Sequence, residues 1–260
     1  MPAATASPLI TDGPFRYIES DGDGPPLLLL HGLFGALSNF AGILERFGDS
    51  RRVVVPMLPV YELPLRKTGI GGLLKYVEDF VAHRRLGRLD LLGNSLGGHV
   101  AQLYALAHPT EVNSLTLTGS SGLFESAMGT GFPKRGDRDY IRKKVGDVFY
   151  DPATATDALI DEVFDVTTDR EKALRVVVTA KSAVRHNLTD RLGEITAPVL
   201  LVWGRQDEVT PPFVAEKFLE LLPDARLVWV DQCGHAPMME HPAQFNDALD
   251  AFLGEVAPLG

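Results

Sequence analysis

Cysteine is almost absent from this chain of 260 residues, which contains only Cys233. One thiol cannot form an internal disulfide, and zinc and iron–sulfur sites usually need several cysteine ligands close together. We therefore expect neither a metal nor a cofactor. We expect Cys233 itself to be a small buried residue that fills space.

An excess of positive charge and a long apolar run are also missing. The formal net charge is -9, whereas a protein that binds nucleic acid needs a basic face. No stretch approaches the run of about 18 apolar residues that spans a membrane, and residues 1–11 lack the positive start and apolar core of a signal peptide. We expect no nucleic-acid partner, no membrane span, a cytoplasmic location and a frayed tail over residues 1–11. The sequence leaves open whether the protein is a homodimer.

Short apolar runs alternate along the chain with longer segments of helical periodicity. This alternation predicts the α/β class, with a mostly parallel sheet covered by helices. The expected strands are 15–19, 27–31, 52–57, 89–93, 114–118, 199–203 and 226–230. The expected helices are 37–47, 72–86, 97–107, 212–222 and 242–253.

The interval 122–193 interrupts this alternation, because it contains no convincing strand. Three helical segments can be drawn in it: one start signal is Asp151-Pro152, and another is the capping-box pattern that opens at Thr168 and ends at Glu171. The interval has 12 Lys and Arg against 12 Asp and Glu, so the rest of the chain accounts for the whole net charge. We divide the chain into an α/β core, residues 1–121 and 194–260, and an inserted helical cap, residues 122–193.

A serine stands where an apolar strand turns abruptly into a helix. The run Gly93-Asn94-Ser95-Leu96-Gly97 follows the strand 89–93, and its two glycines allow a very tight turn. Such a turn holds the serine in a strained backbone conformation with its hydroxyl exposed at the carboxyl edge of the sheet. We predict that Ser95 is a nucleophile.

A nucleophilic serine needs a base, which is usually a histidine oriented by a carboxylate. Asp207 lies just past the strand 199–203, and His235 lies just past the strand 226–230. Both loops are at the carboxyl ends of parallel strands, where open sheets of this kind place their sites. We predict that His235 is the base and that Asp207 orients it.

Other residues compete for these two roles. Glu208 is the rival of Asp207, but the shorter side chain loses less freedom when it fixes a ring nitrogen. The first acid after the strand 114–118 is Glu125, which is poorly placed. Among the seven histidines, His99 and His186 are less clear, although the backbone directs His99 away from Ser95. The surface is the expected place for His83, His108 and His241.

Attack on a carbonyl also needs preset donors for the negative charge that develops on oxygen. The backbone N–H of Leu96, at the start of the helix after Ser95, is one expected donor of this oxyanion hole. The loop His31-Gly32-Leu33-Phe34-Gly35 follows a very apolar strand. We assign the second donor to the N–H of Leu33, with Phe34 as the next choice, and we expect His31 to be a structural hydrogen-bond donor.

The motifs HGLFG and GNSLGG, the Asp207 loop and the Gly234-His235 pair together resemble the α/β-hydrolase fold family, over nearly the whole chain apart from residues 122–193 and the N-terminal tail. The resemblance implies an eight-stranded, mostly parallel sheet with a helical cap inserted after its sixth strand. It also implies a two-step acyl transfer through an acyl-enzyme. Within the family, the chain looks most like capped serine esterases and meta-cleavage product hydrolases, which cut a carbon–carbon bond in dienoates.

Two departures argue against the meta-cleavage branch, and a third concerns the shape of the pocket floor. Meta-cleavage product hydrolases usually have tryptophan after the Gly-His pair and an arginine in the cap, where this chain has Ala236 and Val163. The segment 55–61, Val-Pro-Met-Leu-Pro-Val-Tyr, replaces the Asp-x-x-Gly-x-Gly run common in the family. We expect a serine hydrolase of carboxylic esters with small to medium acyl groups. The alternatives are a carbon–carbon bond hydrolase of a vinylogous diketone, or a ligand-binding receptor with little activity.

Overall fold

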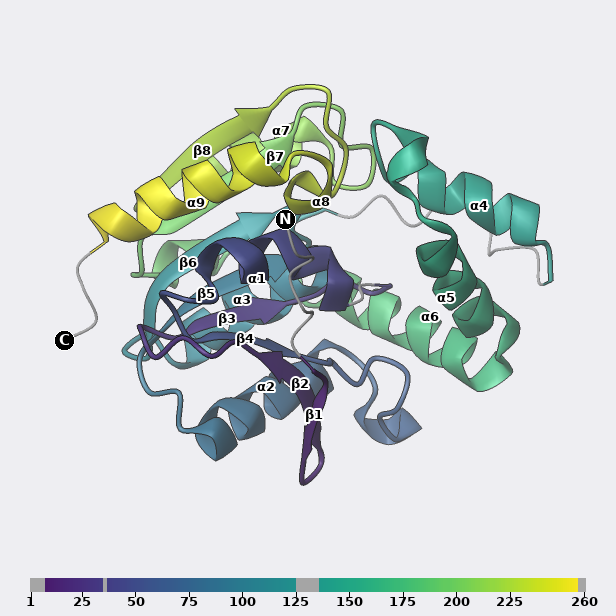
Figure 1. Cartoon of the computed structure of the whole chain (residues 1–260), viewed down its shortest axis with the longest axis horizontal. Helices are drawn as coiled ribbons and strands as arrows, with labels where there is room; N and C mark the ends of the chain where they lie inside the picture. The colour runs from purple at the N-terminus through teal and green to yellow at the C-terminus, as the bar shows by residue number, and fades with distance from the viewer. Residues whose placement is uncertain (1–7, 35–36, 125–135, 257–260) are drawn as a thin grey trace.

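A sheet of eight strands runs through the molecule, with helices on both of its faces (Figure 1). The computed structural model describes residues 8–34, 37–124 and 136–256. β1 pairs antiparallel with β2 and β2 with β4, whereas all other neighbouring strands are parallel. This arrangement confirms the predicted α/β class with an eight-stranded, mostly parallel sheet. In spatial order the strands are β1 (Ile10–Asp12), β2 (Phe15–Glu19), β4 (Val53–Pro56), β3 (Leu27–Leu30), β5 (Leu89–Asn94), β6 (Val112–Thr118), β7 (Val199–Gly204) and β8 (Ala225–Val230).

The central strands are buried on both sides, which explains their composition. Every residue of β3, β4, β5, β6 and β7 is buried. A parallel sheet that is covered on both faces needs near-continuous apolar strands rather than alternating ones. The four leucines of β3 and the three valines that begin β4 meet this requirement.

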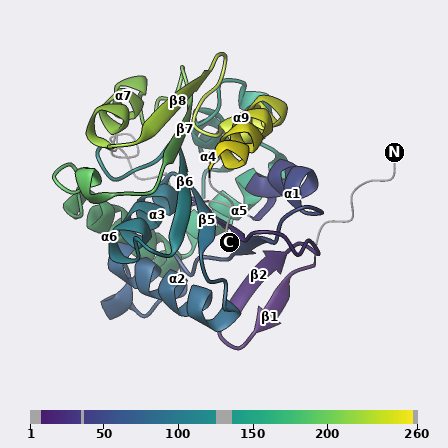
Figure 2. The same ribbon diagram turned by 90° about the vertical axis from the view of Figure 1, so that its left-hand side faces the viewer.

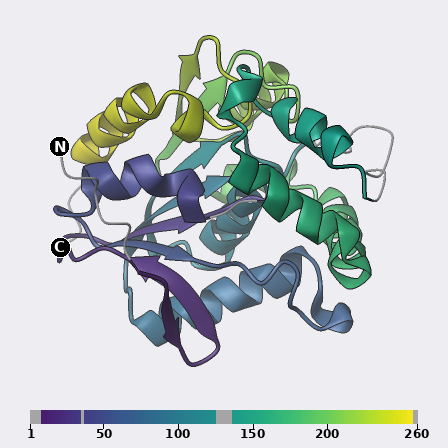
Figure 3. The same cartoon turned by 45° about the vertical axis from the view of Figure 1, so that its right-hand side comes forward.

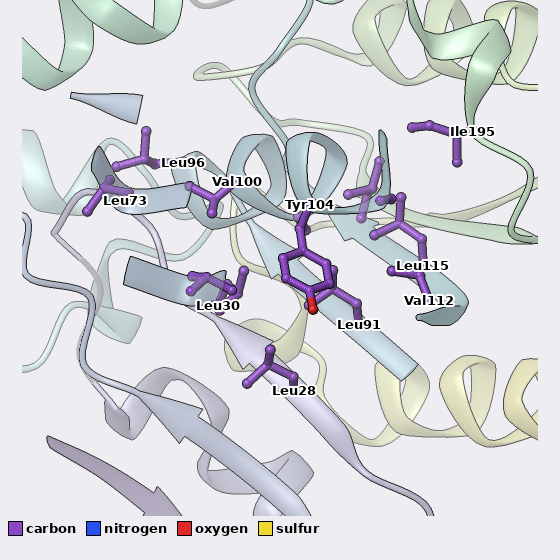
Figure 4. Close-up of a cluster of buried hydrophobic side chains, with 14 of the residues drawn as sticks. Leu28, Leu30, Leu73, Leu91, Leu96, Val100, Tyr104, Val112, Leu115 and Ile195 are labelled. Carbon is purple, nitrogen blue, oxygen red and sulfur yellow. The ribbon is translucent and has the colours of Figure 1, made fainter. Parts of the chain in front are cut away.

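Two layers of helices cover the sheet (Figure 2). One face packs against α2 (Ile70–Arg84), α3 (Leu96–Ala107) and α7 (Pro212–Leu221), and the other against α1 (Ala41–Phe47), α8 (Pro237–Glu240) and α9 (Pro242–Glu255). Figure 4 shows part of the first interface, where Tyr104 and Val100 of α3 lie near Leu28 of β3 and Leu91 of β5. Packing of these apolar helix faces against the sheet fixes the position of α3, and therefore that of Ser95, which directly precedes α3.

Three further helices lie between β6 and β7 in the sequence and to one side of the sheet (Figure 3). They are α4 (Arg138–Gly146), α5 (Asp157–Thr168) and α6 (Arg170–Arg185). Ile141 of α4 and Ile160 of α5 belong to the apolar cluster that also includes Met238 of α8, and α6 packs on α2. Among the described residues of the interval 122–193 there are three α-helices and no strand, as predicted. The start signal Asp151-Pro152, however, opens only a short 3-10 turn, and α5 begins later, at Asp157. The division of this interval from the core as a separate cap stays a prediction. Short 3-10 turns are η1 (Leu37–Phe40), η2 (Leu65–Lys67), η3 (Pro152–Thr154) and η4 (Leu192–Glu194).

Several local predictions were wrong. Residues 10 and 11 are not a frayed tail, because they belong to β1, which forms a hairpin with β2. The expected helix 37–47 is η1 followed by α1. Thr168 does not cap α6: it is the last residue of α5, and its hydroxyl donates to Phe164 O. Asp169 caps α6 instead, because its carboxylate accepts from the first free N–H groups of that helix.

Residues 1–7, Gly35 and Glu125, which the sequence interpretation used, lie outside the described residues. Within the residues that are described, no helix is both long and apolar enough to cross a membrane.

Candidate active site

Ser95 occupies a sharp turn between β5 and α3. Its backbone has φ 54° and ψ -121°, a conformation that non-glycine residues rarely adopt. Four hydrogen bonds hold it there. Ser95 N–H donates to Thr118 O (3.1 Å), and Ser95 O accepts from the N–H groups of His99 (3.2 Å) and Ser121 (3.2 Å) and from the Ser121 hydroxyl (3.2 Å). The turn leaves Ser95 partly exposed, although its neighbours Asn94 and Leu96 are buried.

The glycines on either side of Ser95 are required by close backbone contacts. A Cβ on Gly93 would lie 2.5 Å from Gly97 O, and a Cβ on Gly97 would lie 2.0 Å from Leu30 O. Real Cβ atoms do not approach other atoms this closely. The Gly-x-Ser-x-Gly spacing is therefore a direct consequence of packing the start of α3 against β5 and β3.

Asp207 and His235 form a buried pair at the ends of β7 and β8. His235 Nδ1 lies 2.9 Å from Asp207 Oδ2, and only 2% of Asp207 and 6% of His235 is exposed. The carboxylate also accepts from Val209 N–H (2.8 Å), Thr210 N–H (2.9 Å) and the Thr210 hydroxyl (2.8 Å). A carboxylate held by this many donors is fixed in place, so that it orients the ring and leaves Nε2 available.

The loop that holds His235 meets the turn that holds Ser95. The side-chain amide of Asn94 donates to Thr118 O (3.0 Å) and to His235 O (3.3 Å). A Cβ on Gly119 would lie 2.8 Å from His235 Nδ1. Within the described residues the Ser95 hydroxyl makes no hydrogen bond to His235, and such bonds are often long before substrate binds. The three predicted residues thus lie at one edge of the sheet.

The loop after β3 lies beside Ser95. A Cβ on Gly32 would lie 3.1 Å from the Cβ of Ser95. Within the described part of the chain, the N–H groups of Leu33 and Leu96 donate to no protein acceptor. These two groups, predicted as oxyanion donors, are therefore available for a ligand.

His31 is a structural residue, as expected. Its Nδ1 lies 2.9 Å from Gly32 O, and its Nε2 accepts from Leu58 N–H at 2.9 Å. Burial lowers the pKa of His31, because the charged ring would lose its hydration. A neutral ring with both nitrogens engaged cannot act as a base here.

His99 faces away from the site. It is fully buried, and its Nε2–H donates to His186 O at the end of α6 (2.9 Å). The remaining four histidines each have a partner elsewhere. These pairs are His83 with Asp12, His108 with Glu78, His186 with Ser182 O, and His241 with Gln232 O.

Sequence reasoning missed several residues that support the site. Thr210 could have been found, because a hydroxyl three residues after an aspartate is typical of a turn closed by the side chain. Glu240 accepts from Gly234 N–H (2.9 Å) and Tyr150 N–H (2.7 Å), and no local pattern indicated these partners. Cys233 is buried, as expected. Burial is the main cause that raises the pKa of its thiol, and the Glu240 carboxylate raises this pKa further.

Neither of the two positions that were compared with dienoate hydrolases carries a cation: Val163 lies in α5, and Ala236 lies between β8 and α8. Val163 is buried in an apolar cluster. Arg175 of α6 is largely covered, but it donates to Leu63 O (2.9 Å) and pairs with Glu171. No group of His, Cys, Asp or Glu among the described residues is arranged to hold a metal ion.

Comparison with known proteins identifies related hydrolases. The family described as "Alpha/beta hydrolase family" matches residues 27–248. The 2-hydroxy-6-oxononadienedioate/2-hydroxy-6-oxononatrienedioate hydrolase of Cupriavidus pinatubonensis is 33% identical over 75% of this chain and 71% of its own length. The pimeloyl-[acyl-carrier protein] methyl ester esterase of Nitrosomonas europaea is 29% identical over 90% of this chain and 98% of its own length.

A third relative is the dihydrolipoyllysine-residue acetyltransferase component of the acetoin cleaving system of Pseudomonas putida. It is 31% identical over 92% of this chain, which spans only 66% of that protein. Among solved structures, MGS-MChE2, an alpha/beta hydrolase enzyme from the metagenome of lagoon sediments at Mar Chica in Morocco, has a TM-score of 0.79. It is 39% identical and covers 96% of this chain and 99% of its own.

Proposed function

Because the chain belongs to the alpha/beta hydrolase family, we propose that it is a serine hydrolase that cleaves carboxylic esters of small to medium acyl groups. The main support is the buried Asp207–His235 pair, 2.9 Å between Oδ2 and Nδ1, next to the strained turn at Ser95. The similarity to a methyl ester esterase over nearly the whole chain agrees with this activity.

The proposed reaction has two steps. Ser95 Oγ attacks the ester carbonyl carbon while His235 Nε2 takes the hydroxyl proton, and the resulting oxyanion accepts hydrogen bonds from the N–H groups of Leu33 and Leu96. The intermediate collapses, the acyl–oxygen bond breaks, and the alcohol leaves with the proton from His235. Water then attacks the acyl-enzyme with His235 as its base, which releases the carboxylic acid and restores Ser95.

The helices of the interval 122–193 would form the cap over this site in the proposed enzyme. Val163 of α5 belongs to the apolar cluster near the His235 loop, and the neighbouring Phe164 packs against this cluster. An apolar surface of this kind suits an uncharged acyl group of a small-molecule ester, which we propose as the substrate class.

The proposal is tested by labelling and by turnover. We expect a fluorophosphonate probe to label the wild-type protein at Ser95, and we expect hydrolysis of short p-nitrophenyl esters. The variant Ser95→Ala should lose roughly 10³-fold or more in kcat, as nucleophile removal does in serine hydrolases. The control Ser50→Ala, at an exposed serine, should behave as wild type. Absence of both labelling and turnover in the wild-type protein would disprove the proposal.

Carbon–carbon bond hydrolysis is the second candidate, favoured by the 33% identity to a dienedioate hydrolase. The residues at Val163 and Ala236 argue against it, because a substrate carboxylate would face an apolar cluster rather than an arginine. The dienoate chromophore is the direct test: its absorbance should stay constant in the presence of enzyme, and rapid bleaching would replace the ester proposal with this one. The third hypothesis is a ligand-binding receptor with little activity, and such a receptor would keep its ligand response after Ser95→Ala.

A further inference from the structure

The segment after β4 is fastened to the loop that contains the proposed oxyanion donors. Leu58 N–H donates to His31 Nε2 (2.9 Å), and the hydroxyl of Tyr61 donates to the carbonyl oxygen of Leu33. Both bonds come from residues 55–61, the segment that departs from the family's usual run. The segment 55–61 therefore stabilises the loop that lies beside Ser95.

Two consecutive peptide groups of this loop are fixed in orientation, one by the His31 ring that Leu58 holds and the other by Tyr61. In a trans peptide the C=O and the N–H point in opposite directions, and the described residues include no cis peptide bond. Gly32 O is held by His31 Nδ1–H at 2.9 Å, which directs the N–H of Leu33 the other way. Leu33 O is held by Tyr61, which directs the N–H of Phe34 away from Tyr61 in the same manner.

Tyr61 is well suited to hold this carbonyl. Its ring is half-buried and packs against the apolar cluster between the sheet, α2 and α3. Burial, and to a smaller extent the Glu162 carboxylate of α5, raises the pKa of Tyr61, so that its hydroxyl stays protonated and remains a donor. A donor that cannot ionise at working pH holds the carbonyl under all conditions in which the enzyme would act.

We propose that Tyr61 is a positioning residue of the oxyanion hole: by holding the carbonyl of Leu33, it fixes the Leu33–Phe34 peptide. This anchors Leu33, whose own N–H is the proposed donor, and it keeps the N–H of Phe34, the second-choice donor, on the side away from Tyr61. This inference rests on the proposed ester hydrolysis. Without the Tyr61 hydroxyl the Leu33–Phe34 peptide is free to rotate, and rotation would turn a carbonyl oxygen toward a developing negative charge. This role acts through the backbone of Leu33 and requires no contact between Tyr61 and the substrate.

The test compares Tyr61→Phe with a matched control, Tyr76→Phe. Tyr76 of α2 packs against the same apolar cluster, and its ring centroid lies 5.2 Å from that of Phe15 in β2. Each variant loses one half-buried hydroxyl, so a general effect on stability appears equally in both melting temperatures. Removing an oxyanion donor outright costs about 10²- to 10³-fold in kcat. We therefore expect Tyr61→Phe to lower kcat on a p-nitrophenyl ester about tenfold, with KM changed less than about twofold.

A transition-state analogue separates positioning from general damage. A boronic acid forms a tetrahedral adduct with a catalytic serine and resembles the oxyanion, so its affinity should fall by the same factor as kcat in Tyr61→Phe. The pH profile should not move, because His235 and Asp207 are unchanged. Wild-type kcat and boronic-acid affinity in Tyr61→Phe, while the wild-type protein hydrolyses esters, would overturn the role of Tyr61 alone. A wild-type protein without turnover or labelling would overturn the proposed function instead.

Discussion

Gly119 lies where the loops after β6 and β8 touch, and its lack of a side chain makes room for His235. Its φ is 51°, and a Cβ there would lie 2.7 Å from His235 O, 2.8 Å from Nδ1 and 2.9 Å from Cε1. We predict that Gly119→Ala displaces the imidazole from Asp207 and lowers kcat by at least about 100-fold, since a misplaced base fails at proton transfer. Ester turnover measures the effect.

Gly87→Ala is the matched control for Gly119→Ala. Gly87 also has a positive φ, 64°, but a Cβ there would meet no atom within 4 Å. Both variants should lose about 1 to 2 kcal/mol of stability from the left-handed backbone conformation. Only Gly119→Ala should lose activity, and equal kcat in the two variants would show that Gly119 does not limit the position of His235.

At the scale of single residues, the sequence predicted a role correctly where that role is determined by neighbours in the chain. The glycines around Ser95 were predictable because the contacts that exclude a side chain arise within one tight turn. Tyr61 was not, because its partner Leu33 belongs to another loop, and only the folded chain brings the two together. Asn94 was missed for the same reason, since it bonds to the distant His235 loop.

At the scale of elements, Glu240 of α8 joins the start of the inserted helices to the His235 loop. Its carboxylate accepts from Tyr150 N–H and Gly234 N–H, while His235 N–H donates to Val148 O (2.9 Å). The segment after α4 and the proposed base are therefore parts of one hydrogen-bonded unit. A displacement of this segment would move His235.

We predict that Glu240→Ala lowers kcat about tenfold and the free energy of unfolding by about 2 kcal/mol, because the N–H groups of Tyr150, Gly234 and, at 3.5 Å, Ala236 lose a charged acceptor. The control is Glu220→Ala, at an exposed glutamate that pairs with Lys217 on the same helix. Surface pairs of this kind contribute less than about 1 kcal/mol. Urea unfolding and ester turnover test both variants, and a Glu240→Ala protein that loses stability but keeps its kcat would contradict the link to His235.

Elements were predictable from sequence where length and periodicity agreed, and least predictable where they were short. β1 has three residues, so no alternation can be recognised in it, although Asp12-Gly13 is a hairpin signal that pointed to it. At the junction of α5 and α6 the capping pattern was off by one residue, because Asp169 is both the C-cap of α5 and the N-cap of α6. α8 was missed because four residues contain barely one helical turn.

At the scale of the whole molecule, His99 connects the core to the inserted helices. It lies in α3, and its Nε2–H donates to His186 O at the end of α6, while its buried Nδ1 has no partner within the described residues. Burial lowers the pKa of His99 to about 4, since a proton on Nδ1 would be an N–H without acceptor or water.

This buried histidine predicts acid sensitivity of the fold. The unfolded histidine titrates near pH 6.5 and the folded one near 4, so in this window the unfolded chain binds more protons and stability falls as pH falls. Between pH 7.5 and 5 the loss from His99 is about 2 kcal/mol in the free energy of unfolding. His99→Gln keeps a donor for His186 O but cannot titrate, so urea unfolding should show a pH dependence that is weaker by this amount. If both proteins lose the same stability over this range, His99 is not the group that titrates.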